Sequence, residues 1–152
     1  MSLKEKLQND LTSSMRARDE VRSSTIRMIL TSIKNEEVSG KEARDLSDAE
    51  VITVLSREAK KRREAAEAFD QAGAKDRAYQ ERAEGEIIAE YLPAQLSEAE
   101  IKELIKATIA ETGANSPAQM GLVMKLLQPK TAGKADGGLV SSLVKAALAG
   151  GN

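Results

Sequence analysis

Apolar and polar residues recur with the period of an α-helix along most of the 152-residue chain. Apolar side chains stand three and four positions apart, and no segment has the two-residue alternation of a half-buried strand. The pattern therefore predicts an all-α fold. We expect helices at about residues 3–17, 20–38, 48–72, 76–91, 98–112, 117–128 and 137–148.

Five of these segments carry an apolar stripe on one face, and we expect the stripes to form the core. In chain order the stripes are Ile26, Ile29, Leu30 and Ile33; Ile52, Leu55, Ala59, Ala66 and Phe69; Ile101, Leu104, Ile105 and Ile109; Leu122, Val123, Leu126 and Leu127; and Leu139, Leu143, Val144 and Leu148.

Capping signals support the predicted boundaries. A serine followed three residues later by a glutamate forms a capping box, because each side chain satisfies a backbone N–H of the first turn. Such pairs are Ser2 and Glu5, Ser47 and Glu50, and Ser97 and Glu100. A glycine in the left-handed conformation often ends a helix, and we expect this role for Gly40, Gly73 and Gly113. Pro93 would end the fourth helix, and Pro117 suits a first helical position.

The stretch YLPAQLSEAE, residues 91–100, is the expected boundary between two domains. Its proline and short polar loop separate a heavily charged region of long helices from a less charged region rich in Ala, Leu and Val. We predict an N-terminal long-helix domain over residues 1–92 and a compact three-helix tail domain over residues 97–150. A unit of the second size is small but can fold alone.

Composition excludes several kinds of chemistry. The chain has no cysteine and no histidine, so disulfides, thiolate nucleophiles, imidazole bases and Cys/His zinc sites are ruled out. The carboxylates Glu81, Glu84, Glu86 and Glu90 suggest a hard metal, but di-iron bundles combine such glutamates with histidine. We therefore expect no metal, no cofactor and no catalytic residue.

No apolar run approaches the ~20 residues of a membrane span. The N-terminus, MSLKEKLQND, lacks a hydrophobic signal region. We expect a soluble cytoplasmic protein without a membrane segment.

Charge is unevenly distributed, although the formal net charge is only −1. A balance near zero argues against strong non-specific nucleic-acid binding, which rests on many contacts between basic residues and phosphates. From Gly113 onward, however, Asp136 stands alone against four lysines, at positions 125, 130, 134 and 145. The last part of the chain is therefore mildly basic.

Residues 130–144, KTAGKADGGLVSSLV, invite comparison with a phosphate-binding loop. A P-loop requires Ser or Thr after its Gly-Lys pair and a strand before it. Here Ala135 follows Gly133 and Lys134, and no strand is predicted. We reject a nucleotide-binding P-loop.

A structural interpretation of the same stretch is favoured. Asp136 can cap the last helix by accepting from the N–H of Gly138 or Leu139, and the glycines permit tight turns. The beginning of a helix also attracts anions, but the Asp136 carboxylate would repel them. We therefore expect Lys130 and Lys134, rather than the cap itself, to meet a phosphate.

The run REAKKRREAAEAF, residues 57–69, reads as a solvated helix with ion pairs four residues apart, such as Glu58 with Arg62. Arg62 nevertheless lies within the apolar stripe. We favour a structural role, with an aliphatic stem against the core or an ion pair to another helix, over a position in a groove.

Four segments together resemble the GatB/YqeY family, specifically its free-standing YqeY-like members. They are RSSTIRMILTSIKNEE, AEGEIIAEYLPAQLSEAEI, QMGLVMKLL and GKADGGLVSSLVKAAL, and the resemblance runs over essentially the whole chain. One departure follows the third predicted helix, where family members commonly have Ala-Gly-Arg-x-Asp-Leu. Residues 72–77 read Ala-Gly-Ala-Lys-Asp-Arg instead.

The resemblance implies a tail similar to the C-terminal part of the B subunit of the tRNA-dependent amidotransferase, where that part helps to hold the tRNA. The candidate nucleic-acid-binding residues that it implies are Lys125, Lys130, Gly133, Lys134, Asp136 and Gly137.

Three functions remain open at this point. The first is a tRNA-interacting accessory module related to the amidotransferase. The second is a carbon–nitrogen ligase with glutamine as amido donor, although the chain has no evident set of catalytic groups. The third is an adaptor whose N-terminal helices bind a protein partner.

Overall fold

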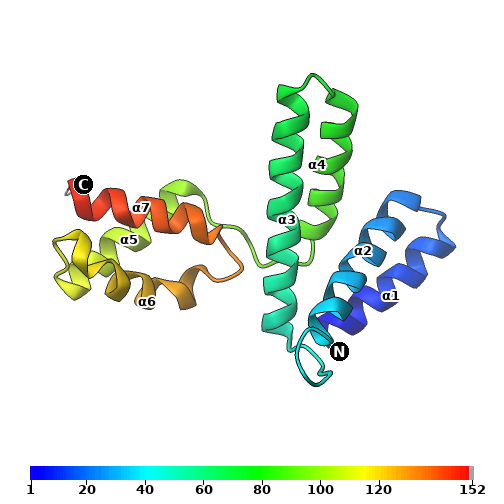
Figure 1. Ribbon diagram of the computed structural model, residues 1–152, viewed down its shortest axis with the longest axis horizontal. Helices are drawn as coiled ribbons and strands as arrows, with labels where there is room; N and C mark the ends of the chain where they lie inside the picture. The colour runs from blue at the N-terminus through cyan, green and yellow to red at the C-terminus, as the bar shows by residue number, and fades with distance from the viewer. Residues whose placement is uncertain (151–152) are drawn as a thin grey trace. The chain divides into compact units, whose positions relative to one another are not determined.

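A computed structural model describes residues 1–150, and most of these residues are helical. No strand occurs in that part of the chain, which confirms the all-α prediction. Two compact units are present (Figure 1). Unit 1 spans Met1–Leu92, and unit 2 begins at Pro93.

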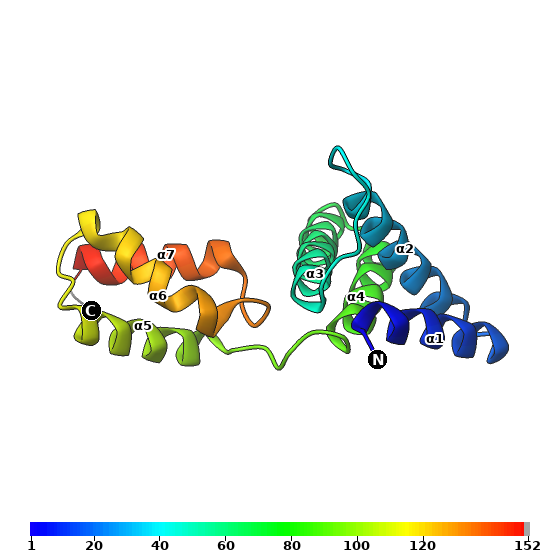
Figure 2. The same ribbon diagram turned by 90° about the horizontal axis from the view of Figure 1, so that it is seen from below.

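Unit 1 contains α1 (Leu3–Arg16), α2 (Glu20–Glu37), α3 (Asp48–Gln71) and α4 (Lys75–Ala89). Helices α3 and α4 lie side by side as an antiparallel hairpin in both views (Figure 1, Figure 2). Gly73, with φ at 77°, begins the turn between them. The capping boxes of Ser2 and Ser47 both form as predicted.

The predicted left-handed end at Gly40 is wrong. Positive φ angles among the described glycines occur at Gly73, Gly113 and Gly133. Helix α2 ends earlier, and the N–H groups of Val38 and Ser39 donate to the carbonyls of Lys34 and Glu36 at 3.2 and 3.3 Å. Because these amides already satisfy the last carbonyls, no left-handed glycine is needed there.

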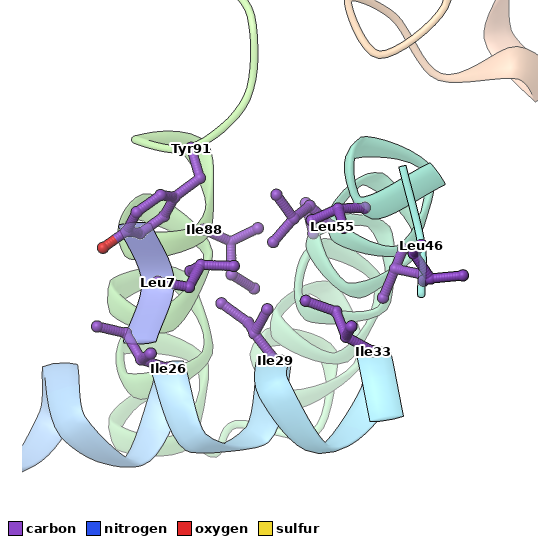
Figure 3. Packing of buried hydrophobic residues seen from close by; sticks show 11 residues of the cluster. Leu7, Ile26, Ile29, Ile33, Leu46, Leu55, Ile88 and Tyr91 are labelled. Carbon is purple, nitrogen blue, oxygen red and sulfur yellow. The ribbon is translucent and has the colours of Figure 1, made fainter. Parts of the chain in front are cut away.

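The core of unit 1 is aliphatic. Leu7, Ile29, Leu55 and Ile88 are fully buried and converge between the helices (Figure 3). The aromatic contribution to this cluster is Tyr91, whose hydroxyl donates to Asp10 across 2.6 Å. Close packing of branched aliphatic side chains therefore replaces the aromatic contacts that many cores use.

Glu37 supplies a buried polar anchor at the end of α2, where its side chain is only 3% exposed. Lys4 of α1 donates to both carboxylate oxygens at 2.9 and 2.8 Å, and the Leu46 N–H donates at 3.3 Å. The Glu37 carbonyl also accepts from the Arg44 N–H at 3.0 Å. One residue thus ties α1, α2 and the following loop together, and Lys4 holds the pKa of the Glu37 carboxyl below its usual range.

Arg62 has the structural role that its place in the stripe favours. Its guanidinium lies 3.4 Å from Glu58 on its own helix, and 3.2 and 3.7 Å from Glu84 and Glu81 on α4. Two of the carboxylates considered as metal ligands, Glu81 and Glu84, therefore face a largely buried arginine. Glu90, a third, pairs with Arg22 of α2 at 2.8 Å.

Unit 2 contains α5 (Glu98–Thr112), the 3₁₀ turn η1 (Pro117–Gln119), α6 (Met120–Thr131) and α7 (Gly137–Gly150). The helix predicted at 117–128 is therefore a 3₁₀ turn followed by an α-helix that passes Pro129. The Ala132 N–H reaches the Gln128 carbonyl at 2.9 Å, and Thr131, the last residue of the helix, is buried. A proline in the last turn leaves those later hydrogen bonds intact.

The predicted core of unit 2 is partly wrong. Ile101, Ile105, Val123, Val144 and Leu148 are buried as expected. Three predicted core leucines are instead exposed, namely Leu122 at 47%, Leu126 at 38% and Leu139 at 39%. A three-helix unit covers only one side of each helix, so an apolar stripe that is too wide leaves its edge in solvent.

Substitution Glu37→Gln tests the buried anchor. The amide can still accept from Leu46, but Lys4 loses its anionic partner, and we expect unfolding free energy to fall by roughly 1–3 kcal/mol at pH 7. A depressed folded-state pKa stabilises the fold above the unfolded pKa, and this stabilisation disappears as pH falls through the folded value. The difference between variant and wild type in urea denaturation should therefore shrink below about pH 4.5.

Asp45→Asn is the matched control for that substitution, since Asp45 is 98% exposed and lies 3.8 Å from the same lysine. We expect a change below about 0.5 kcal/mol. Equal effects of the two substitutions, or a Glu37→Gln effect that persists at acid pH, would contradict the anchor.

The two units can be separated at the Leu92–Pro93 bond to test whether each is a domain. Each contains its own aliphatic cluster, so we expect both fragments to unfold cooperatively in urea, the smaller one with the lower stability. Circular dichroism at 222 nm follows the transition. A gradual, non-cooperative loss of helix in either fragment would show that it needs the other.

Candidate nucleic-acid interface

The predicted binding residues lie on α6, on the start of α7 and on the loop that joins them. Lys125 and Lys130 belong to α6, and Gly137 is the first residue of α7. Lys134 stands in the intervening loop, residues 132–136, which we call the α6–α7 loop. All of them therefore belong to unit 2, and all except Lys125 fall within residues 130–137, at the α6–α7 junction.

The α6–α7 loop is a tight turn held against the end of α6. Gly133 has φ at 73°, a conformation in which a side chain would be strained. The carbonyl of Thr131 then accepts from the N–H groups of Lys134 and Ala135 at 2.9 and 3.1 Å. The backbone that carries Lys134 is thereby fixed to the last residue of α6.

A second set of hydrogen bonds joins this loop to residues 93–96, which we call the linker segment. The Leu96 N–H donates to the Lys134 carbonyl at 2.8 Å. The Gln95 side-chain amide donates to the Gly133 carbonyl at 2.8 Å and to the Pro93 carbonyl at 2.7 Å. Since both acceptors are carbonyls, the NH₂ group of Gln95 must face them.

Asp136 caps α7 as the sequence predicts. Its carboxylate accepts from the Gly138 N–H at 3.3 Å, and its carbonyl accepts from the Val140 N–H at 3.0 Å. An anion approaching the first turn of α7 would meet this carboxylate. Gly137 has open space around it, so that no close packing requires a glycine at this position.

The three predicted lysines lie at the surface of unit 2, whereas Lys102 of α5 pairs with Glu98 at 3.4 Å. Lys125, Lys130 and Lys134 are exposed, and none forms an ion pair with a carboxylate within residues 1–150. Lys125 and Lys130 stand five positions apart on α6, which rotates their side chains about 140° from each other. Lys125 and Lys130 therefore face different sides of α6, and Lys130, in the last turn, is the one nearer in sequence to Lys134 of the loop.

Sequence reasoning missed Gln95 and Leu96 as parts of this site. A signal was present, because both belong to the YLPAQLS block, but their contacts span 38 positions along the chain from Gln95 to Gly133. Periodicity and capping rules describe neighbours in sequence, and neither identifies a partner at that distance.

Other features of unit 2 lie away from the lysines. A hollow of about 800 Å³ between α5 and α7 is lined by apolar side chains and by Lys102, Glu103, Lys106 and Asn115. None of the predicted binding residues lines it. Within the described chain, no group of three or more carboxylates gathers as metal ligands would. No helix among residues 1–150 has the length and apolar character to cross a membrane.

Comparison with known proteins supports a family assignment. The family model of YqeY-like proteins matches residues 4–148. The mitochondrial protein called altered inheritance of mitochondria protein 41 from Lachancea thermotolerans is 32% identical over 146 residues, covering 93% of this chain and 76% of the relative. Its namesake from Clavispora lusitaniae is 34% identical over 122 residues, covering 78% of this chain and 70% of that protein. The chain therefore belongs to the YqeY-like family.

Proposed function

We propose that this protein is an accessory RNA-binding protein that contacts tRNA through the α6–α7 end of unit 2. The observation that carries the proposal is the pair Lys130 and Lys134, exposed, close in sequence around one tight turn, and without a carboxylate partner among residues 1–150. The resemblance of the tail to that of the amidotransferase B subunit supports tRNA as the ligand.

Local charge, rather than net charge, supports an anionic partner. Unit 1 carries most of the acids, but many of them already pair with lysine or arginine, as Glu37, Glu90 and Asp70 do. The lysines of α6 and the α6–α7 loop have no such partners. A phosphate backbone can therefore gain contacts there although the whole chain is slightly acidic.

The mode of recognition follows from what unit 2 lacks. From Pro93 onward the sequence has no aromatic residue and no arginine. Stacking on exposed bases normally uses aromatic rings or guanidinium planes, and bidentate reading of guanine uses arginine. Lysines bind phosphate as point charges, so contact would be to the backbone, weak and dependent on the shape of the RNA.

The salt dependence of binding tests the lysine pair. We expect a fluorescently labelled tRNA transcript to bind the full chain at low salt, with affinity that falls as salt rises. The double variant Lys130→Ala/Lys134→Ala should bind more weakly and reduce the slope of log K against log salt by roughly 1.5, because two phosphate contacts are lost. Fluorescence anisotropy across a salt series measures both quantities.

Lys102→Ala/Lys106→Ala is the matched control, because it removes two exposed lysines from α5 of the same unit. This variant should keep a slope close to that of wild type. Equal loss in both double variants would point to a diffuse electrostatic effect. Absence of binding at low salt would reject the proposal and direct attention to a protein partner.

Sequence preference gives an independent test. If contact is to backbone phosphates alone, the affinities for two tRNAs of different sequence should lie within about threefold of each other. A single-stranded oligonucleotide of equal length has a different shape, so its affinity should differ from both. Competition against the labelled tRNA measures all three. A preference above tenfold for one tRNA would contradict recognition by charge and shape alone.

A further inference from the structure

Some backbone carbonyls of the α6–α7 loop accept hydrogen bonds from outside the loop. The carbonyls of Gly133 and Lys134 are among them, whereas the first amides of α7 bond Asp136. Carbonyls without partners are costly unless water or another segment supplies donors. Here the donors come from the linker segment, through the Gln95 amide and the Leu96 N–H.

The two donors act at successive residues of the loop. Gln95 holds Gly133, the one left-handed residue of this loop, and Leu96 holds Lys134, the residue that carries the exposed charge. Gln95 also bonds the Pro93 carbonyl, which fixes the bend of the linker segment itself. Directly after it, the Ser97 box fixes the start of α5.

We propose that the linker segment positions the phosphate-contacting loop of unit 2, with Gln95 as the positioning residue, so that RNA binding and the conformation of the connection between the two units are coupled. This inference rests on the proposed function for its ligand. Gln95 need not touch RNA. It selects the conformation of the loop that carries Lys134, next to the end of α6 that carries Lys130.

Coupling of this kind is reciprocal. If the hydrogen bonds of the linker segment favour the binding conformation of the loop, RNA bound at the loop must favour those hydrogen bonds by the same factor. Binding at the surface of unit 2 would then order residues 93–96, through which the chain leaves unit 1. A lysine loop that acted only as a charged surface would have no such effect.

Amide hydrogen exchange of the free protein tests the positioning without RNA. Gln95→Met keeps the length of the side chain but removes its donors, and Gln95→Glu places acceptors against two carbonyls. We expect both variants to speed exchange at Lys134, Ala135 and Leu96 by roughly two- to tenfold. Gln128→Met, at an exposed glutamine of α6 whose side chain makes no hydrogen bond within residues 1–150, should leave these amides unchanged.

Binding by the same variants tests the coupling. With the labelled tRNA, Gln95→Met should lower affinity roughly two- to tenfold in the wild-type background but less than about 1.5-fold when Lys134 is already alanine. Saturating tRNA should slow exchange of the Leu96 amide in wild type and much less in Gln95→Met.

The outcomes separate the two proposals. Unchanged exchange in both Gln95 variants, or effects of Gln95→Met and Lys134→Ala that simply add, would overturn the inference while leaving tRNA binding in place. If wild type does not bind tRNA at low salt, the proposed function fails, and the exchange rates of the free protein alone decide whether Gln95 positions the loop.

Discussion

Within each unit, the packing depends on loop N–H and carbonyl groups that have no hydrogen-bond partner inside a helix. An unpaired N–H or carbonyl away from water is costly, so each loop must find donors and acceptors elsewhere. In unit 1 the residue that supplies them is Glu37, which accepts from the Leu46 and Arg44 amides. In unit 2 the linker segment supplies them to the α6–α7 loop. The helices are formed by local rules, but their arrangement depends on these longer connections.

Local rules explain why so much of the fold could be predicted. Capping at Ser2, Ser47 and Ser97 involves residues three positions apart, and the predicted boxes form in all three cases. The same is true of the turn at Gly113 and the cap at Asp136. Each of these features depends only on residues within about one helical turn of each other, so the local sequence is enough to predict it.

The predictions fail where a contact between residues far apart in the sequence determines the local structure. Gly40 lies in a loop whose later part Glu37 holds through the Arg44 and Leu46 amides, and α6 passes Pro129 to end at Thr131, which is buried. Leu122 and Leu126 were predicted to lie in the core, because an apolar stripe does not indicate how many neighbouring helices will cover it. The same limit applies to the candidate site, whose lysines and cap were evident in the sequence while Gln95 was not.

Electrostatics and connectivity point to the same end of unit 2. A net charge near zero would ordinarily argue against an RNA partner. Many carboxylates of unit 1 already face a lysine or arginine, however, and such a carboxylate repels a phosphate less than an unpaired one does. The charge of Lys125, Lys130 and Lys134, which have no carboxylate partner within residues 1–150, then dominates the local electrostatic potential. Lys134 lies on the loop that is hydrogen-bonded to residues 95 and 96, and Lys130 lies in the last turn of α6 directly before that loop. Unit 2 has neither arginine nor aromatic side chains, so it has little means of recognising individual bases. Selectivity for an RNA would then have to come from the positions in which its lysines are held.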